Sequence, residues 1–185
     1  AELKDALKGK ALISVALGYD HARLSALLDE STRIQFIMPN TPAMVGAGVM
    51  IFEGTSTLEA AERAEIMEKF KTLGIVEELP THLMGIGGAV SGCGPAFAYL
   101  FIEALADGGV ACGLPRAQAM EFAAQMVAGS AKLILESKKH PGQLKDEVCS
   151  PGGTTIQGVR ALEKGGFRSA VTEAVIAAYE KNFEL

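Results

Sequence analysis

Apolar segments of strand length alternate with helical segments over the first 80 residues, and this alternation limits the folds that the chain can adopt. The segments that predict strands are Ala11–Leu17, Arg33–Met38, Val49–Glu53 and Ile75–Leu79. Helical spacing of apolar residues predicts helices over His21–Leu28 and over Leu58–Leu73, the second opened by Thr57. Strands that alternate with helices in this way indicate an α/β sheet.

Strand patterns are absent after residue 80, and helical periodicity replaces them. The predicted helices cover His82–Val90, Pro95–Cys112, Arg116–Ser137, Gln143–Val148, Ile156–Lys164 and Phe167–Phe183. The sequence therefore predicts two domains, an α/β domain over residues 1–80 and an all-α domain over residues 81–185.

The predicted helix Pro95–Cys112 is apolar on every side. Leu100 and Phe101 share one face, and Ala98 and Gly109 on other faces are not polar either. A helix that is apolar all round must be buried, and a helical domain of roughly 100 residues has little interior to bury it. Either neighbouring helices of the same chain wrap it, or a partner subunit covers it; the second reading predicts a homodimer.

Composition excludes several classes of partner. The net charge is −5 and no cluster of Lys and Arg occurs, which argues against nucleic acid. The apolar runs Ala11–Gly18 and Ile86–Val90 are too short to cross a bilayer, so no membrane span is expected. Three scattered cysteines without metal-ligand spacing predict reduced thiols in a cytoplasmic protein and no metal site.

A glycine turn, Ser150-Pro151-Gly152-Gly153-Thr154-Thr155, precedes the predicted helix Ile156–Lys164. Pro151 ends the preceding helix, and the two glycines permit a tight turn and the close approach of a ligand. The first N–H groups of the following helix would then form a site for a phosphate or a carboxylate. The alternative is a turn without a ligand, in which Thr154 or Thr155 caps the helix.

The sequence lacks a complete dinucleotide-binding fingerprint, which is a strand, Gly-x-Gly-x-x-Gly and a helix. Gly85-Ile86-Gly87 and Gly92-Cys93-Gly94 each supply two of the three glycines and follow no predicted strand. The chain also opens in a helix that leads directly into a strand. We therefore expect an upstream strand–helix series to be missing and the chain to be a piece of a longer protein.

Five further motifs precede the glycine turn in a fixed order. They are Met38-Pro39-Asn40-Thr41-Pro42, Ser91-Gly92-Cys93-Gly94-Pro95-Ala96, Ala104-Leu105-Ala106-Asp107-Gly108-Gly109-Val110, Gly113-Leu114-Pro115-Arg116 and His140-Pro141-Gly142-Gln143-Leu144-Lys145-Asp146. In this order and spacing the chain closely resembles pyrroline-5-carboxylate reductase, from about Leu12 to about Glu180.

The resemblance implies the C-terminal portion of a Rossmann-type dinucleotide-binding domain, followed by an all-α helical dimerisation domain. It implies hydride transfer from NADPH or NADH to the imine of 1-pyrroline-5-carboxylate, which gives L-proline in the final step of proline biosynthesis. It also implies a homodimer through the C-terminal helices, or an oligomer of such dimers. Without a complete cofactor site, we expect the chain to be inactive alone.

The resemblance assigns substrate-binding roles to Ser150, Gly152, Gly153, Thr154 and Thr155. Backbone N–H groups around Gly153 would hold the carboxylate, and the Thr155 hydroxyl would reach the ring nitrogen as the catalytic group.

Four residues are assigned to the cofactor, and each has a plain alternative. Ala16 and Leu17 could be a strand end, Asn40 a turn residue, and Glu147 a solvated helix charge. Leu17 departs from the family, in which a smaller alanine is usual, and Thr81 and His82 replace acidic residues.

Two competing classes remain. A related imine or β-hydroxyacid reductase would normally carry a lysine on the catalytic helix, and no lysine lies between Cys93 and Arg116. A non-catalytic helical dimerisation module would have no reason to keep the glycine turn together with Asn40.

Overall fold

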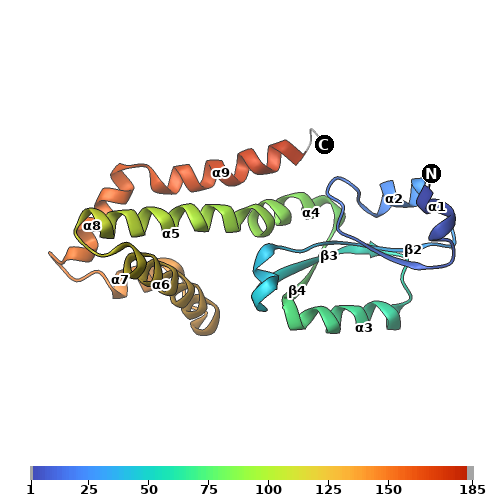
Figure 1. Ribbon diagram of the computed structural model, residues 1–185, viewed down its shortest axis with the longest axis horizontal. Coiled ribbons are helices and arrows are strands. Elements are labelled where there is room, and N and C mark those ends of the chain that lie inside the picture. The colour runs from blue at the N-terminus through green and yellow to red at the C-terminus, as the bar shows by residue number, and fades with distance from the viewer. Residues whose placement is uncertain (1, 183–185) are drawn as a thin grey trace. The chain divides into compact units, whose positions relative to one another are not determined.

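The computed structural model describes residues 2–182, which form two compact units. Unit 1 contains the chain up to Pro95 together with the residues from Val175 onward, and unit 2 is Ala96–Ala174. Figure 1 labels the helices and strands of both units.

Unit 1 is built on a four-stranded sheet in which the strands follow one another in chain order. The strands are β1 (Ala11–Ser14), β2 (Arg33–Met38), β3 (Gly48–Ser56) and β4 (Gly74–Leu79). The pairs β1–β2 and β3–β4 are parallel, whereas β2 and β3 are antiparallel. The predicted α/β sheet is therefore confirmed, and β2 has its predicted bounds. Because β1 and β2 are parallel, the residues that follow Ser14 and Met38 leave the sheet at the same edge.

Helices cover both faces of this sheet. They are α1 (Glu2–Ala6), α2 (His21–Leu27), α3 (Ala60–Phe70) and α4 (Thr81–Gly88), with the short 3₁₀ turns η1 (Thr41–Val45) and η2 (Lys71–Leu73). Side chains alternate across a strand, so Phe36 packs with Met84 of α4, while its neighbour Ile37 belongs to the cluster that includes Phe70 of α3. In Figure 1, α2 and α3 lie on opposite sides of the sheet.

The start of α3 differs from the prediction that Thr57 opens it. The helix begins at Ala60, and its N-cap is Glu59, which makes no side-chain capping bond. Thr57 instead extends the pairing of β3 with β2: its hydroxyl accepts from the Ile34 N–H at 2.7 Å, and its own N–H donates to the Ile34 carbonyl at 3.0 Å. Thr57 therefore pairs with β2, which is distant in sequence, instead of capping α3.

A buried carboxylate joins two of these helices to β3. Glu53 is 1% exposed and accepts hydrogen bonds from the His21 N–H at 2.9 Å and from the Thr81 hydroxyl at 2.6 Å. His21 and Thr81 are the first residues of α2 and α4, where helices favour a negative charge. Glu53 therefore stabilises the start of both helices.

We expect Glu53→Gln to lower the free energy of unfolding by about 1–3 kcal/mol, because one buried donor then faces an amide NH₂ group. Urea unfolding should be compared with that of Glu77→Gln, a change at an exposed position on β4. Equal stability of the two variants would contradict this role.

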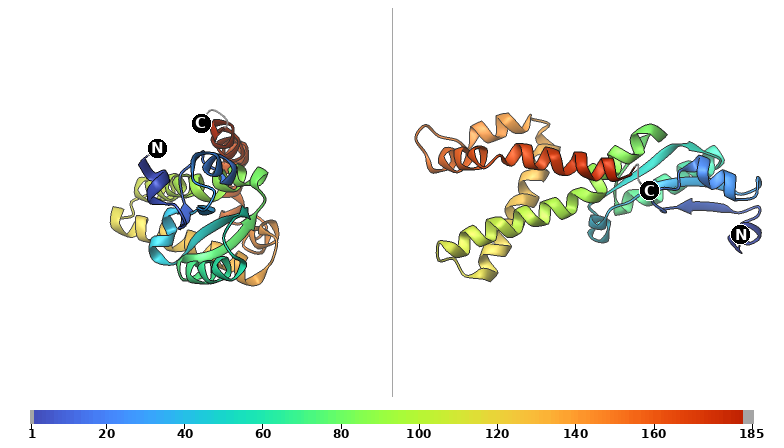
Figure 2. Two further views of the ribbon diagram at one scale, coloured as in Figure 1. Left: turned by 90° about the vertical axis from the view of Figure 1, so that its right-hand side faces the viewer. Right: turned by 90° about the horizontal axis from the view of Figure 1, so that it is seen from above.

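The two helices predicted over His82–Val90 and Pro95–Cys112 form one continuous helix, Thr81–Ala111, of 31 residues. A π-helical turn, η3 (Ala89–Cys93), connects α4 to α5 (Gly94–Ala111), and in Figures 1 and 2 the ribbon runs through without a break. The predicted interruption at residues 91–94 is therefore wrong. A π turn accommodates an extra residue without ending the helix, and proline is tolerated near the start of a helical segment.

Unit 2 contains only helices. Besides α5 they are α6 (Arg116–Ser137), α7 (Pro141–Glu147), α8 (Thr154–Lys164) and α9 (Phe167–Lys181), the last of which continues into unit 1. The helical prediction is confirmed, and α6 has its predicted bounds; the predicted end of the last helix at Phe183 falls outside the described residues.

Unit 2 buries little of its apolar surface within the chain. Its core cluster consists of Ala106, Ala119 and Ala123, packed by Ile102, Val110 and Leu114. Leu100 on α5 is 66% exposed, and Phe122 on α6 is 59% exposed. The reading in which neighbouring helices of the same chain wrap α5 is therefore wrong, since Ala106 is its only buried residue within the described chain.

Candidate functional site

The predicted glycine turn forms a closed β-turn. The Gly153 N–H donates to the Ser150 carbonyl at 3.0 Å, with Pro151 and Gly152 between them. Gly152 has φ +71°, a conformation that favours glycine, and proline followed by such a glycine is the sequence of a type II turn. A Cβ on Gly153 would lie 2.3 Å from Ser150 Oγ, so no other residue fits there without a shift. The turn therefore requires glycine at position 152 for its backbone conformation, and a side chain at position 153 would displace the Ser150 hydroxyl.

The turn ends at the start of α8 without a side-chain cap. The N-cap is Gly153, and Thr154 and Thr155 are the first two helical residues, so the alternative in which a threonine caps the helix is wrong. The reason is geometric: the turn already brings Gly153 into the extended conformation of an N-cap, at φ −72° and ψ 172°.

Several polar groups at this helix terminus remain unpaired. Within residues 2–182, neither the N–H groups of Thr154 and Thr155 nor their hydroxyls have a hydrogen-bond partner. Both threonines are exposed. The terminus therefore offers N–H donors and a positive dipole end to an anion. The Gly153 N–H is engaged in the turn, which leaves Thr154 and Thr155 as the first free donors.

Glu147, at the end of α7, is paired with a cation. Its Oε1 accepts from Lys139 Nζ at 2.8 Å and from Gln143 Nε2 at 3.2 Å, and its side chain is 45% exposed. Next to it, a hydrogen bond from Lys145 to the Asp146 carboxylate raises the pKa of the Lys145 ammonium. These contacts are those of a solvated helix end.

The loop after β1 carries Ala16 and Leu17 away from the sheet. Buried Ser14 accepts the Ala16 N–H on its hydroxyl at 3.3 Å, and the Tyr19 N–H donates to the Ala16 carbonyl at 3.1 Å, which closes a turn over residues 16–19. The strand therefore ends at Ser14, three residues before its predicted end. Ala16 is exposed, and Leu17 is 54% exposed.

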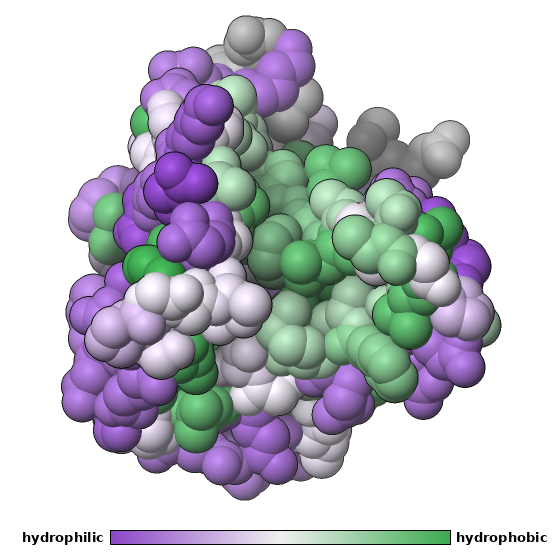
Figure 3. All heavy atoms as spheres, turned by 90° about the vertical axis from the view of Figure 1, so that its left-hand side faces the viewer, coloured by the Kyte–Doolittle hydropathy of each residue, from purple (hydrophilic) through white to green (hydrophobic). Residues whose placement is uncertain are grey.

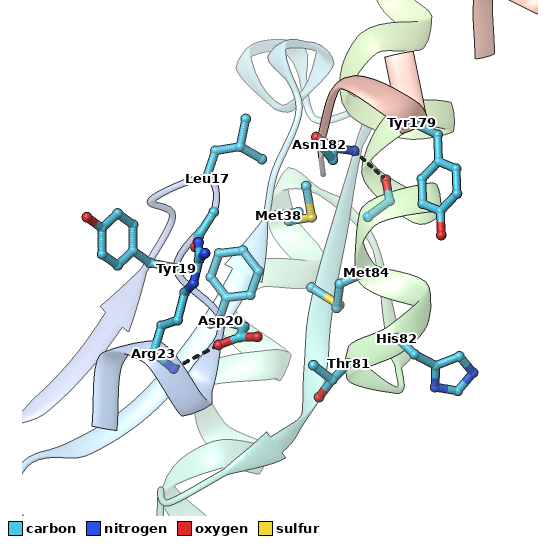
Figure 4. Close-up of a pocket in the computed structure, with 13 residues that line it drawn as sticks. Leu17, Tyr19, Asp20, Arg23, Met38, Thr81, His82, Met84, Tyr179 and Asn182 are labelled. Carbon is cyan, nitrogen blue, oxygen red and sulfur yellow. Dashed lines mark hydrogen bonds between the residues drawn. The ribbon is translucent and has the colours of Figure 1, made fainter. Parts of the chain in front are cut away.

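Leu17 and Gly18 line a pocket of about 470 Å³ in unit 1. Phe36, Met38 and Met84 form an apolar part of its wall. In Figure 4 the side chain of Met84 extends from α4 toward the side on which Met38 and the loop of Leu17 lie. The remaining lining residues are Tyr19, Asp20, Arg23, Thr81, His82, Gly85, Tyr179 and Asn182.

Hydrogen bonds hold the rim of this pocket in place. Asp20 caps α2 by accepting the Arg23 N–H at 2.8 Å, and the Arg23 guanidinium donates to the Gly18 carbonyl. On the other side, Asn182 Nδ2 donates to the Gly85 carbonyl at 3.2 Å (Figure 4). Sequence reasoning missed this pocket. Asp20 before a helical pattern was a usable sign of the cap, but the contact between residues 85 and 182 has no local sign.

Asn40 follows β2 and lies at the same sheet edge as the loop of Leu17, but it does not line the pocket. Its side-chain amide is engaged on both sides: Nδ2 donates to the Ser91 carbonyl at 2.9 Å, and Oδ1 accepts the Val49 N–H at 2.9 Å. The predicted site residues thus fall into two groups, with Ala16, Leu17 and Asn40 in unit 1 and Glu147 and Ser150–Thr155 in unit 2.

An apolar groove of about 560 Å³ lies in unit 2 between α5, α8 and α9. Figure 3 shows apolar side chains gathered around a hollow on this face of the molecule. The lining is almost wholly hydrophobic and consists of Phe97, Ala98, Leu100, Phe101, Ala104, Leu105, Leu162, Phe167, Ala170, Val171 and Ala174.

Known proteins resemble the chain over nearly its whole length. The family model for pyrroline-5-carboxylate reductase dimerisation matches residues 81–185. The pyrroline-5-carboxylate reductase of Synechocystis is 49% identical over 180 residues, which is 97% of this chain and 63% of the relative. That of Escherichia coli K12 is 44% identical over 178 residues, or 96% of this chain and 66% of the relative. The chain thus spans 63% to 66% of the length of these curated relatives.

A solved structure agrees with the sequence matches. The crystal structure of Plasmodium falciparum pyrroline carboxylate reductase with NADP bound has a TM-score of 0.91 and 38% identity, and the match covers 98% of this chain and 73% of that one. The long helix Thr81–Ala111 is the one described helix that is long and apolar enough to span a bilayer. It begins the segment that matches the dimerisation model. The chain belongs to the pyrroline-5-carboxylate reductase family.

Proposed function

We propose that the protein to which this chain belongs reduces 1-pyrroline-5-carboxylate to L-proline with NADPH or NADH, the final step of proline biosynthesis. Membership of the family supports the reaction class. The observation that carries the proposal is the uncapped start of α8, where two free N–H groups and the free Thr155 hydroxyl follow a turn in which Gly153 packs closely against the Ser150 hydroxyl.

The substrate carboxylate would occupy this helix terminus. The N–H groups of Thr154 and Thr155 are its donors, Gly152 and Gly153 keep the approach open, and the Ser150 hydroxyl forms the near wall. The ring nitrogen of the imine is two bonds from the carboxylate carbon, so a substrate held here places that nitrogen beside the start of α8. Thr155 then orients the protonated nitrogen and shares its proton as the hydride adds to the ring carbon.

The cofactor site is proposed for unit 1. When bound, NADPH or NADH supplies the hydride. Ala16 and Leu17 fit a role beside the nicotinamide end, because they leave a parallel strand pair at its carboxyl edge, where such folds bind ligands, and Leu17 stands at a pocket mouth. The turn that contains Asn40 follows the neighbouring strand at this edge and would lie near the nicotinamide ring, while the Asn40 amide itself is engaged by backbone groups. Glu147 is also proposed for the cofactor site, with less support, because its carboxylate already pairs with Lys139. We propose that the cofactor-binding domain covers residues 1–80 and that the helical dimerisation and substrate-binding domain covers residues 81–185.

We expect Leu17→Ala to lower the KM for NAD(P)H by up to roughly fivefold, which is the effect expected from a change of about one apolar contact. The kcat should stay within about threefold of the parent value. Leu17 is larger than the alanine that the family usually carries at this position, so its exposed side chain would narrow the cofactor cleft. Leu27→Ala, at a similarly exposed position on α2, serves as the control. An unchanged KM in both variants would remove Leu17 from the cofactor site.

The exposed apolar helices of unit 2 support a homodimer in which a second copy covers α5, with an oligomer of dimers as the larger form. The free cysteines Cys93, Cys112 and Cys149 support a reducing compartment, and we propose the cytoplasm.

The deciding experiment follows NAD(P)H oxidation in the presence of 1-pyrroline-5-carboxylate. It compares this chain with a chimera that adds the part of the Synechocystis relative outside the matched region. Activity of the chimera alone supports a site completed by that part. A folded chimera that binds cofactor and ignores this substrate would contradict the proposal, and oxidation with other cyclic imines would then identify a related imine reductase.

A further inference from the structure

The Asn40 side chain connects two segments that are distant in sequence. Its Nδ2 donates to the carbonyl of Ser91, 51 residues away, and its Oδ1 accepts the N–H of Val49, the second residue of β3. Both bonds are 2.9 Å long. With both polar atoms engaged by backbone groups, the amide acts as a clamp between the start of β3 and the π-helical turn η3.

The Ser91 carbonyl needs such a donor. A π turn pairs a carbonyl with the N–H five positions later, which here is Ala96. In the α-helical ladder that resumes in α5, this carbonyl would instead accept the N–H of the residue four positions later. That residue is Pro95, which has no N–H. An unpaired carbonyl at this half-buried position would be costly, and the Asn40 amide supplies the missing donor.

The π turn is also packed tightly against β2. A Cβ on Gly88, directly before the turn, would lie 2.1 Å from Met38 Cε, and Ala89 is 1% exposed. Within the turn, the Ser91 hydroxyl donates to the Gly87 carbonyl at 2.8 Å. Asn40 is therefore one of several contacts made by the segment around η3, and it supplies a donor to a carbonyl that Pro95 cannot reach as a donor in the α-helical ladder.

We propose that Asn40 is a positioning residue that clamps the π turn through the Ser91 carbonyl, and that it acts on the reaction through this turn and not as a ligand of the cofactor. The turn is the last part of unit 1 before the chain enters unit 2 at Ala96. The catalytic part of the inference rests on the proposed function, whereas the clamp itself does not.

The clamp is tested by a double-mutant cycle with Asn40→Ala and Pro95→Ala. Asn40→Ala is expected to lower the Tm by roughly 3–6 °C, from the loss of two hydrogen bonds in a domain of this size. In the Pro95→Ala background, residue 95 carries an N–H that can reach the Ser91 carbonyl. The Tm loss caused by Asn40→Ala should then be about half as large. Equal losses in both backgrounds would overturn the clamp.

Hydrogen exchange gives a second test that does not need Pro95→Ala to fold. Asn40→Asp keeps the acceptor for Val49 but has no donor for Ser91. We expect exchange in residues 89–94 to speed up roughly tenfold or more in Asn40→Asp, while the Val49 N–H keeps its protection. Unchanged exchange in residues 89–94 would contradict the proposal even if stability fell.

Kinetics of the active chimera distinguish positioning from cofactor binding. A positioning role predicts that Asn40→Ala lowers kcat roughly tenfold, leaves the Kd for NADPH within about twofold, and is partly rescued by Pro95→Ala. A Kd for NADPH raised tenfold, with hydrogen exchange of the turn unaltered, would make Asn40 a cofactor ligand and overturn the proposal. If the parent chimera shows no reductase activity, the proposed function fails, and the stability cycle and hydrogen exchange still decide the clamp.

Discussion

Thr155→Ala is expected to lower kcat/KM for 1-pyrroline-5-carboxylate roughly tenfold to a thousandfold in the active chimera, the scale of one lost catalytic hydrogen bond. The Thr155 hydroxyl has no partner within the described residues, so its removal breaks no contact of the folded chain. The loss should therefore appear in catalysis and not in stability. Steady-state kinetics, with the Tm recorded beside them, check both parts.

Two further variants test whether the loss of activity comes from the Thr155 hydroxyl. Thr155→Ser keeps the hydroxyl and should recover most of the lost rate. Thr172→Ala removes an exposed helical threonine of unit 2 whose hydroxyl donates only to the Arg168 carbonyl, and it should leave kcat/KM within about twofold. An unchanged kcat/KM in Thr155→Ala would remove this residue from the mechanism, although the carboxylate site formed by the backbone could remain.

Leu100→Glu is expected to convert the proposed dimer into monomers. Leu100 is 66% exposed within one chain and lines the apolar groove of unit 2. A partner that covers this groove would bury the new carboxylate without a cation, and twofold symmetry would repeat the cost in the second copy. Burial of unpaired charges at several kcal/mol each lowers the association constant by roughly a thousandfold or more.

Sedimentation equilibrium measures this effect directly. Leu27→Glu places the same charge on a leucine of unit 1 that is 57% exposed, and it should leave the molar mass of the dimer unchanged. A Leu100→Glu protein that still sediments as a dimer would move the interface away from the groove. Dissociation of both variants would indicate general destabilisation instead.

Part of the active-site proposal could be reached from local sequence alone. The turn over residues 150–153 and the helix after it depend on proline, two glycines and a nearby helical pattern, all within one short segment. The pocket beside Leu17 could not be reached in this way, because its walls come from residues as far apart as Gly18, Met84 and Asn182. The role of Thr154 and Thr155 as caps was the local alternative, and the turn geometry excludes it.

The sequence by itself determined the two classes of architecture, the bounds of β2 and α6, and the family, because periodicity and motif order are properties of neighbouring residues. Only the tertiary structure decided the rest. Residues 91–94 were expected to separate two helices, yet the helix continues through them, and Asn40 donates to the Ser91 carbonyl from 51 residues away. Thr57 and Glu53 likewise pair with partners more than 20 residues distant. Such contacts follow from packing, which brings together groups whose separation along the chain leaves no periodic signal.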